Sequence, residues 1–218
     1  MGPEVSVFLD LDGTLLDVSR RYYAVHQEIV SQIGGEVRDA ATFWRLKQEA
    51  TSIEKLTGLV SSDARQYHRR WKLLIEAPSY LELDEWLPEA GVTLRSLAAH
   101  YNVVIVTLRG KANALHSQLR TLRCPDVAQV LSAPAGADPA AAKAHLIQSS
   151  PYYTKPAVIA GDTEVDIRAG KALGLTTIAV LSGIRSGVRL ATESPDFTIG
   201  TIRELPDTLL HLFQKVGS

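Results

Sequence analysis

A short apolar run near the start of the chain, residues 5–9, leads directly into the acidic segment 10–14, which reads Asp-Leu-Asp-Gly-Thr. The run is typical of a buried parallel strand. Asp10 and Asp12 continue the twofold period of this strand, so both carboxylates point to the same side where it ends. Gly13 gives the chain the freedom to turn away beside them. Two such carboxylates repel one another unless a cation is present, and a divalent metal ion would supply that charge.

The composition suits one large domain, or one domain with an insertion. The 218 residues are 45% hydrophobic and 22% charged, enough to bury a sizeable core. The net charge is −1 with acids and bases dispersed, so we expect neither nucleic acid nor a membrane as a partner. No apolar run approaches membrane-spanning length, and no signal-peptide pattern precedes residues 5–9. The single cysteine, Cys124, cannot form a disulfide within the chain, and we expect a cytoplasmic protein.

The rest of the chain divides into a helical stretch and an alternating one. Residues 17–84 show helical periodicity and contain no convincing strand. Beyond them, helical segments alternate with apolar strands, expected at residues 102–107, 127–131, 157–160, 176–181 and 197–199. This alternation is typical of an α/β protein with a doubly wound parallel sheet. We therefore predict an α/β core made of residues 1–16 and 85–218, with residues 17–84 inserted as a small α-helical domain.

Polar side chains follow several of the predicted strands, and ligands of such sheets bind at the carboxyl ends of the strands. Thr107 ends the strand after the insertion. Asp162 follows the strand at residues 157–160, and Asp166 lies four residues on, in the first turn of a helix. Acids favour first turns of helices, but an acid on the same side as Asp162 can also hold a metal ion or its waters.

Together these segments resemble the motifs of the haloacid dehalogenase-like (HAD) phosphohydrolases. Residues 10–14 are similar to the first motif, Asp-x-Asp-Gly-Thr, and residues 161–166 are similar to the fourth, Gly-Asp-x-x-x-Asp. Thr107 matches the second motif, a hydrophobic strand that ends in Ser or Thr. A helical insertion after the first strand is most similar to the phosphoglycolate-phosphatase-like branch. The resemblance covers essentially the whole chain and implies a Rossmann-like core with a helical cap.

The resemblance implies a role for each motif residue. Asp10 would be the nucleophile that forms an aspartyl-phosphate, and Asp12 would be the general acid and base. In the family the second acid also touches the metal through its backbone carbonyl, so Asp10, Asp12, Asp162 and Asp166 would hold Mg²⁺. Thr107 would hydrogen-bond the phosphoryl oxygens.

The third motif requires a lysine that balances charge between the nucleophile and the phosphoryl group. Lys143, in the helix before the strand at residues 157–160, fits the family order. The match is incomplete, because Ala144 follows where many relatives have proline. Lys155 does precede a proline but adjoins the strand, and Lys111 is a further alternative.

Substrate contacts are expected from Thr107, Leu108 and Arg109, because Arg109 lies just beyond Thr107, where it can meet an anionic substrate. In the helical insertion, Arg20 and Arg45 are further candidates. Most basic residues on helices are solvated, which is the simpler interpretation of both.

The resemblance therefore implies a Mg²⁺-dependent phosphatase that hydrolyses a small phosphomonoester through an aspartyl-phosphate. A phosphomutase would keep the same motifs and remains an alternative, as does a non-catalytic phosphate-binding module on the same fold. A haloacid dehalogenase is disfavoured, because by family pattern it lacks the second acid, here Asp12. We expect a small phosphorylated metabolite as the partner, and a monomer or homodimer.

Replacing the nucleophile provides the first test. Asp10→Asn should leave folding nearly intact and lower turnover by a factor on the order of a thousand or more, because an amide oxygen is a poor nucleophile toward phosphorus. Steady-state phosphate release and thermal unfolding of the purified variant measure the two effects. Wild-type rates in Asp10→Asn would contradict the aspartyl-phosphate mechanism.

Overall fold

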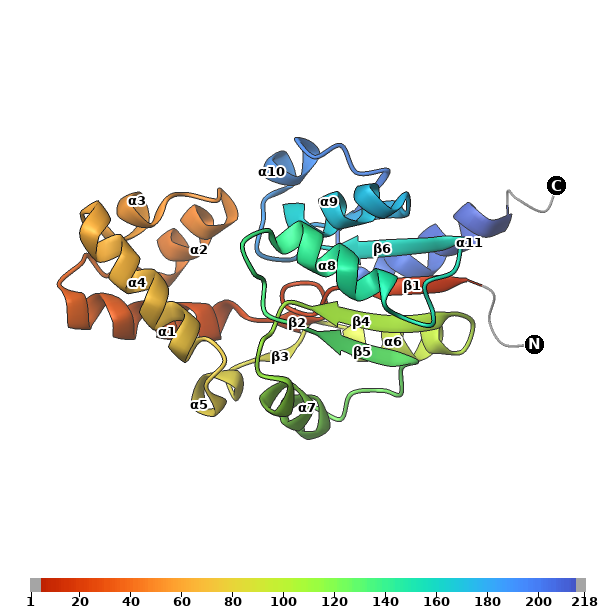
Figure 1. Ribbon diagram of the computed structural model, residues 1–218, viewed down its shortest axis with the longest axis horizontal. Helices are drawn as coiled ribbons and strands as arrows, with labels where there is room; N and C mark the ends of the chain where they lie inside the picture. Colours follow the sequence, from red (N-terminus) through yellow and green to blue (C-terminus); the bar gives the residue numbers. More distant parts are fainter. Residues whose placement is uncertain (1–4, 215–218) are drawn as a thin grey trace.

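The computed structural model describes residues 5–214, apart from the side chains of residues 61, 62 and 214. Within this range, six strands form one parallel sheet (Figure 1). The strands are β1 (Ser6–Leu9), β4 (Asn102–Thr107), β5 (Gln129–Ser132), β6 (Ala157–Gly161), β7 (Thr176–Val180) and β8 (Phe197–Ile199). Their order is β5-β4-β1-β6-β7-β8, so β1 lies between β4 and β6. The predicted doubly wound parallel sheet is confirmed.

The side chains of β1 alternate between two apolar clusters, one on each face of the sheet, as the period of a strand requires. Val7 and Leu9 are fully buried in the first cluster, and Phe8 is fully buried in the second. The first face is covered by α6 (Ala90–Ala98), α7 (Ala112–Thr121) and α11 (Leu205–Gln214). The second face is covered by α8 (Pro139–Gln148) and α9 (Glu164–Leu173). Within residues 5–214, no helix has the length and apolar character needed to span a membrane.

A bundle of helices lies beside the sheet, at the left of Figure 1. Its members are α1 (Ser19–Ile33), α2 (Ala40–Gln48), α3 (Ile53–Thr57), α4 (Ser61–Leu74) and α5 (Pro78–Leu81). Val25 and Ile29 of α1 pack against Tyr67 of α4. Phe43 of α2 packs against Leu56 of α3. The bundle therefore has apolar clusters of its own.

The two connections between the bundle and the sheet run side by side. β2 (Leu16–Asp17) and β3 (Glu85–Trp86) form a short antiparallel pair. A pair this short carries no periodicity that a sequence pattern can show. We propose the division into a core of residues 1–16 and 85–218 and a cap of residues 17–84. Residues 1–4 and 215–218 of that division lie outside the described residues.

Two further sets of hydrogen bonds hold the bundle against the core. At the end of α2, the Gln48 carbonyl accepts from the Ser186 amide at 3.1 Å, and the Gln48 side chain donates to the Gly183 carbonyl at 3.1 Å. After α4, the Glu76 carboxylate accepts from the amides of Gly110 at 2.9 Å and Lys111 at 2.8 Å. These amides precede α7, where a negative charge is favourable. The described conformation is one in which the bundle is docked on the core.

A buried histidine lies inside the bundle. His26 is fully buried, and its Nδ1 lies 3.1 Å from the Tyr67 hydroxyl. Within the described residues, its Nε2 has no hydrogen-bond partner. Burial, together with the nearby charge of Lys47, lowers the pKa of His26 to about 4. The folded protein therefore holds this imidazole neutral at pH values where the unfolded chain protonates it.

The bundle should lose stability as the pH falls. The pKa of His26 is about 6.5 in the unfolded chain and about 4 in the folded protein, so between these pH values the unfolded state binds more protons. The unfolding free energy therefore keeps its full value above pH 6.5 and falls as the pH is lowered below it. Protonation of this histidine in the unfolded state should lower the unfolding free energy by about 1–2 kcal/mol at pH 5 relative to pH 7. Urea unfolding of His26→Leu at both pH values should show a smaller difference than the wild type. His68, exposed on α4, is the matched control, and an unchanged pH dependence in His26→Leu would contradict the assignment.

Candidate active site

The carboxyl ends of the neighbouring strands β4, β1 and β6 bring four of the predicted side chains to one place. Asp10 follows β1, Thr107 ends β4, Asp162 follows β6, and Asp166 lies in the first turn of α9. Their exposed fractions are 7%, 2%, 0% and 1%, in that order. Buried polar groups require partners, so each carboxylate must be stabilised by its immediate surroundings.

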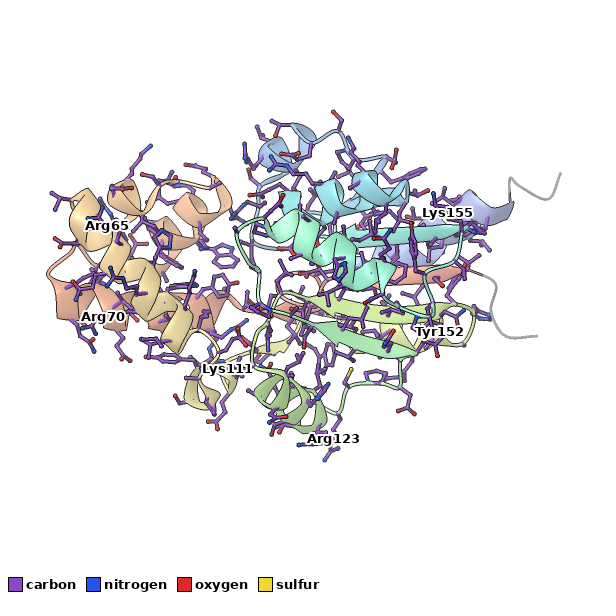
Figure 2. All side chains as sticks on the ribbon, viewed as in Figure 1. Arg65, Arg70, Lys111, Arg123, Tyr152 and Lys155 are labelled. Atoms are coloured by element: carbon purple, nitrogen blue, oxygen red, sulfur yellow. The ribbon has the colours of Figure 1, made fainter. Side chains whose placement is uncertain are left out.

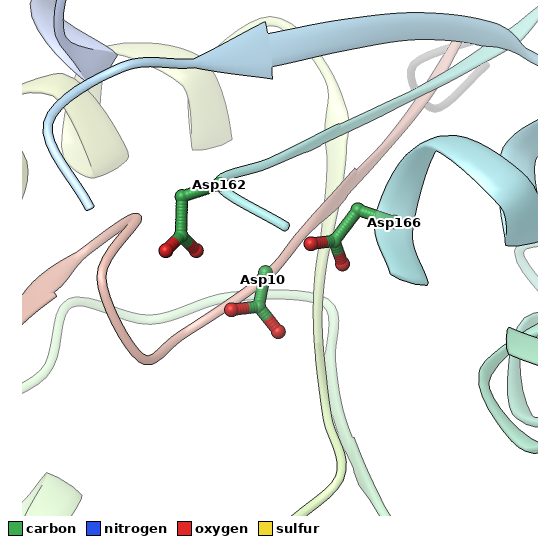
Figure 3. Close-up of side chains that lie close together, drawn as sticks. All are labelled: Asp10, Asp162 and Asp166. Carbon is green, nitrogen blue, oxygen red and sulfur yellow. The ribbon is translucent and has the colours of Figure 1, made fainter. Parts of the chain in front are cut away.

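The carboxylates of Asp10, Asp162 and Asp166 face one another, as Figure 3 shows. One oxygen of each lies within 4.8 Å of the others. Carboxylate oxygens are the ligands that Mg²⁺ and Ca²⁺ prefer. Two of the three acids come from separate strand ends and the third from a helix, so the sheet topology builds this cluster.

The Asp162 carboxylate is held on both sides. It accepts hydrogen bonds from the Thr14 hydroxyl at 2.9 Å and from the Ile184 amide at 2.6 Å. Gly13, with φ +90°, and Gly183 pass so close that a Cβ on either would collide with this carboxylate. The glycine of the first motif is therefore required both by the backbone conformation and by the space that Asp162 fills.

Asp166 serves both the helix and the cluster. Its Oδ2 accepts from the amide of Thr163 at 3.1 Å and from the hydroxyl of Thr163 at 2.8 Å, which caps α9. Its Oδ1 accepts from the ammonium of Lys143 at 2.5 Å. The cap leaves one oxygen of Asp166 pointing into the site.

Lys143 is the lysine that reaches the acids. It is 3% exposed, and its ammonium contacts both Asp10 and Asp166. Burial alone would lower the pKa of this ammonium, but the two carboxylates outweigh it and raise that pKa. Figure 2 shows Lys155 beside the start of β6 and Lys111 before α7, where Lys111 donates to the Leu73 carbonyl at 3.2 Å.

The cluster carries more negative charge than Lys143 balances. Burial raises the pKa of the Asp10 carboxyl, with the Lys143 ammonium acting against it. Burial, followed by repulsion from Asp10 and Asp166, raises the pKa of Asp162 well above its usual range. Opposed carboxylates in a dry site are stabilised by a cation, so the residues present fit a divalent metal ion.

Asp12 has a different environment. Its carboxylate lies 2.9 Å from the Arg21 guanidinium, accepts from Arg109 Nε at 3.1 Å and also contacts Arg109 Nη2. Burial alone would raise the pKa of Asp12, but Arg109 and Arg21 outweigh it and hold that pKa well below its usual range. The side chain of Asp12 is therefore not a member of the acidic cluster. Metal contact through its backbone carbonyl, which the family resemblance implies, stays a prediction.

A cavity of about 830 Å³ opens above these groups, between the bundle and the sheet. Asp10, Asp12, Thr107 and Lys143 line its floor. Its other walls include Arg21, Tyr22, Trp71, Lys72, Ile75, Glu76, Leu108, Arg109, Lys111, Pro134 and Thr163. The volume lies within the range usual for small-molecule sites.

Comparison with known proteins establishes the fold. Residues 135–205 match the family model described as HAD-hydrolase-like. A HAD-like family hydrolase from Streptococcus pneumoniae is 19% identical with a TM-score of 0.77, covering 94% of this chain and 97% of that one. A predicted phosphatase from Clostridium acetobutylicum is 16% identical with a TM-score of 0.76, covering 96% and 100%. A predicted phosphoglycolate phosphatase from Haemophilus somnus is 15% identical with a TM-score of 0.68, covering 95% and 98%.

The chain has the HAD fold. The resemblance to the HAD phosphohydrolases is thereby confirmed at the level of the fold, and the matched family model includes residues 161–166 but not residues 10–14. No curated protein shows significant sequence similarity to the chain. At the identities found, the structural similarity describes the fold, and the chemistry must be argued from the site itself.

Only some of the predicted substrate-binding residues line the cavity. Thr107, Leu108 and Arg109 line the cavity, and their contact with the substrate stays a prediction. Arg20 and Arg45 do not line it: Arg20 pairs with Glu85 at 2.7 Å and Arg45 with Glu49 at 3.1 Å, and both arginines are largely exposed. Their placement corrects the expectation that they face the substrate.

The arginine that does enter the site is the neighbour of Arg20. Successive residues of a helix point about 100° apart, so Arg21 faces the core while Arg20 faces solvent. Sequence reasoning also missed Asp84 and Gln118, which are buried beside Arg21 and Arg109. An arginine on the apolar stripe of α1, shared with Val25 and Ile29, was the available signal for Arg21.

Removing one acid of the cluster should stabilise the metal-free protein. The folded-state pKa of Asp162 is raised, so its ionised form costs stability once the pH rises above the unfolded value of 3.8. Asp162→Asn should therefore raise the unfolding free energy in EDTA at pH 7, and this gain should shrink as the pH is lowered toward 4.

The same variant should also respond less to metal. Mg²⁺ should raise the melting temperature of the wild type more than that of Asp162→Asn, because binding to the folded state stabilises it. Asp17→Asn, an exposed acid on β2, is the matched control. An undiminished Mg²⁺ response in Asp162→Asn would move the metal site elsewhere.

Proposed function

We propose that the protein is a Mg²⁺-dependent phosphatase that hydrolyses a small phosphomonoester through an aspartyl-phosphate on Asp10. The observation that carries this proposal is the contact of the buried Lys143 ammonium with Asp10 at the floor of the cavity. A cation fixed beside a buried carboxylate stabilises charge that gathers there during phosphoryl transfer.

Asp10, Asp162 and Asp166 would hold the metal ion. When bound, Mg²⁺ would neutralise phosphoryl charge and offset the repulsion among the three carboxylates. HAD-like hydrolases generally use a divalent metal, and the acidic cluster fits one.

The residues on the cavity floor account for two transfer steps. In the first, a carboxylate oxygen of Asp10 forms a bond to phosphorus, the ester P–O bond breaks, and the leaving oxygen receives the proton carried by Asp12. In the second, water attacks phosphorus, Asp12 takes the water proton, and the bond between Asp10 and phosphorus breaks to release phosphate. Arg21 and Arg109 favour the ionised form of Asp12, which is the form that takes the proton from water.

The remaining groups bind the substrate. Thr107 ends β4 beside Asp10 and is proposed to hydrogen-bond the phosphoryl oxygens. Tyr22 and Trp71 of the bundle line the cavity, and a bundle over the floor would favour small metabolites over phosphoproteins or nucleic acids. A cytoplasmic monomer or homodimer remains our prediction for the chain.

Multiple-turnover phosphate release tests the proposal. The protein should release inorganic phosphate from p-nitrophenyl phosphate and from members of a panel of phosphorylated metabolites with Mg²⁺, and EDTA should abolish the release. Asp17→Asn should keep the wild-type rate. Conversion of a sugar phosphate to its isomer without phosphate release would instead indicate a phosphomutase. Phosphate binding without turnover of any panel member would indicate a binding module.

A further inference from the structure

Four buried side chains surround the Asp12 carboxylate and one another. Arg21 and Arg109 contact Asp12 directly. Both also contact Asp84: Arg21 Nε lies 3.0 Å from one oxygen, and Arg109 Nη2 lies 3.1 Å from the other. Gln118 accepts from Arg109 Nη1 and donates to Asp84 at 2.8 Å. We call Arg21, Asp84, Arg109 and Gln118 the Asp12 clamp.

The members of the clamp come from elements far apart in the sequence. Arg21 lies in α1 of the bundle, and Asp84 lies in the second connection, next to β3. Arg109 follows β4, and Gln118 lies in α7 of the core. Arg21 is also fixed within the bundle, because its Nη1 donates to the Ile75 carbonyl at 3.0 Å. The clamp therefore joins the bundle, one connection and the core at Asp12.

The clamp is almost fully buried and balanced in charge. The exposed fractions of Arg21, Asp84, Arg109 and Gln118 are 1%, 3%, 3% and 7%. Two guanidinium groups face the carboxylates of Asp12 and Asp84, so no net positive charge is left to bind a second anionic group of a substrate. Buried ion pairs are often no more stabilising than apolar side chains of similar volume, so stability alone does not explain why four such groups are gathered here.

Gln118 hydrogen-bonds to both Asp84 and Arg109. Its amide nitrogen donates to the Leu81 carbonyl at 2.6 Å as well as to Asp84. Its oxygen therefore accepts from Arg109 Nη1, while Nε and Nη2 of the same guanidinium contact Asp12. Gln118 does not line the cavity, so it acts on the reacting groups only through Arg109 and Asp84.

We propose that the Asp12 clamp is a positioning unit that fixes the orientation of the Asp12 carboxylate, and that it is complete only while α1 is docked on the core. The inference rests on the proposed function, in which Asp12 transfers the proton to the leaving oxygen. Because the bundle supplies Arg21, undocking α1 removes one of the two groups that orient Asp12. Proton transfer is thereby coupled to closure of the bundle over the substrate.

A comparison of leaving groups tests the clamp. Nitrophenolate leaves phosphorus without a proton, whereas the alkoxide of glycerol 2-phosphate requires one. In Gln118→Leu, kcat/KM for glycerol 2-phosphate should fall by about tenfold or more, while kcat/KM for p-nitrophenyl phosphate should change by less than about threefold. Because kcat/KM reports the steps up to departure of the leaving group, the later hydrolysis of the aspartyl-phosphate does not blur the comparison.

A second pair of variants repeats the test on α1. Arg21→Lys keeps the charge but loses the fork that reaches Asp12, Asp84 and Ile75 together, so it should show the same selective loss. Arg20→Lys changes the adjacent, exposed arginine outside the cavity and is the matched control for which both rates should stay unchanged. Thermal unfolding of each variant checks that it is folded. If Gln118→Leu does not fold, the result with Arg21→Lys decides whether the clamp positions Asp12.

The outcomes separate the clamp from the function on which it rests. Equal losses with both phosphates, or no loss with either, would mean that the network is structural only and would overturn the proposal. Faster turnover of glycerol 2-phosphate would mean that the arginines restrain Asp12, and would overturn it as well. Failure of the wild type to turn over either phosphate would instead count against the proposed phosphatase activity.

Discussion

The structure depends on the burial of three carboxylates within 4.8 Å of one another at the end of the central strand. Repulsion and desolvation make this arrangement unfavourable unless its surroundings compensate. The compensation comes from every neighbouring element. α8 supplies the Lys143 ammonium, the turn after β1 supplies the Thr14 hydroxyl, and α9 binds one oxygen of Asp166 through its own cap. The same surplus of negative charge makes the site suitable for a divalent cation.

Two kinds of charged site therefore lie side by side on the cavity floor. Around Asp10 the acids outnumber the cations, and burial raises the pKa of the Asp10 carboxyl. Asp12 lies two residues further along the chain, and arginines from the bundle and the core hold the pKa of its carboxyl low. The twofold period of the strand brings the two carboxylates to the same end of the sheet, but tertiary contacts give them opposite environments.

Much of this site could be predicted from sequence, because its central residues lie on short motifs at strand ends. Asp10 and Asp162 each follow an apolar strand directly, and parallel strands place their carboxyl ends together. Lys143 could be assigned only from its order in the chain, since nothing local separates it from a solvated lysine. Arg21, Asp84 and Gln118 depend on contacts between elements that are remote in sequence. The phase of α1 decides that Arg21 and not Arg20 faces Asp12, and a two-residue strand pair decides where Asp84 lies.

The short pair of β2 and β3 has a consequence for how the chain reaches this fold. Ser6 of β1 pairs with Asn102 of β4, and the whole bundle lies between them in sequence. Closing so long a loop is entropically costly, and folding slows as contacts become more distant in sequence. The bundle, however, packs around its own apolar clusters and returns the chain to its point of departure. Once the bundle has formed, β1 and β4 are joined by a far shorter effective loop, so folding of the bundle offsets much of the kinetic cost that its insertion adds to the pairing of these strands.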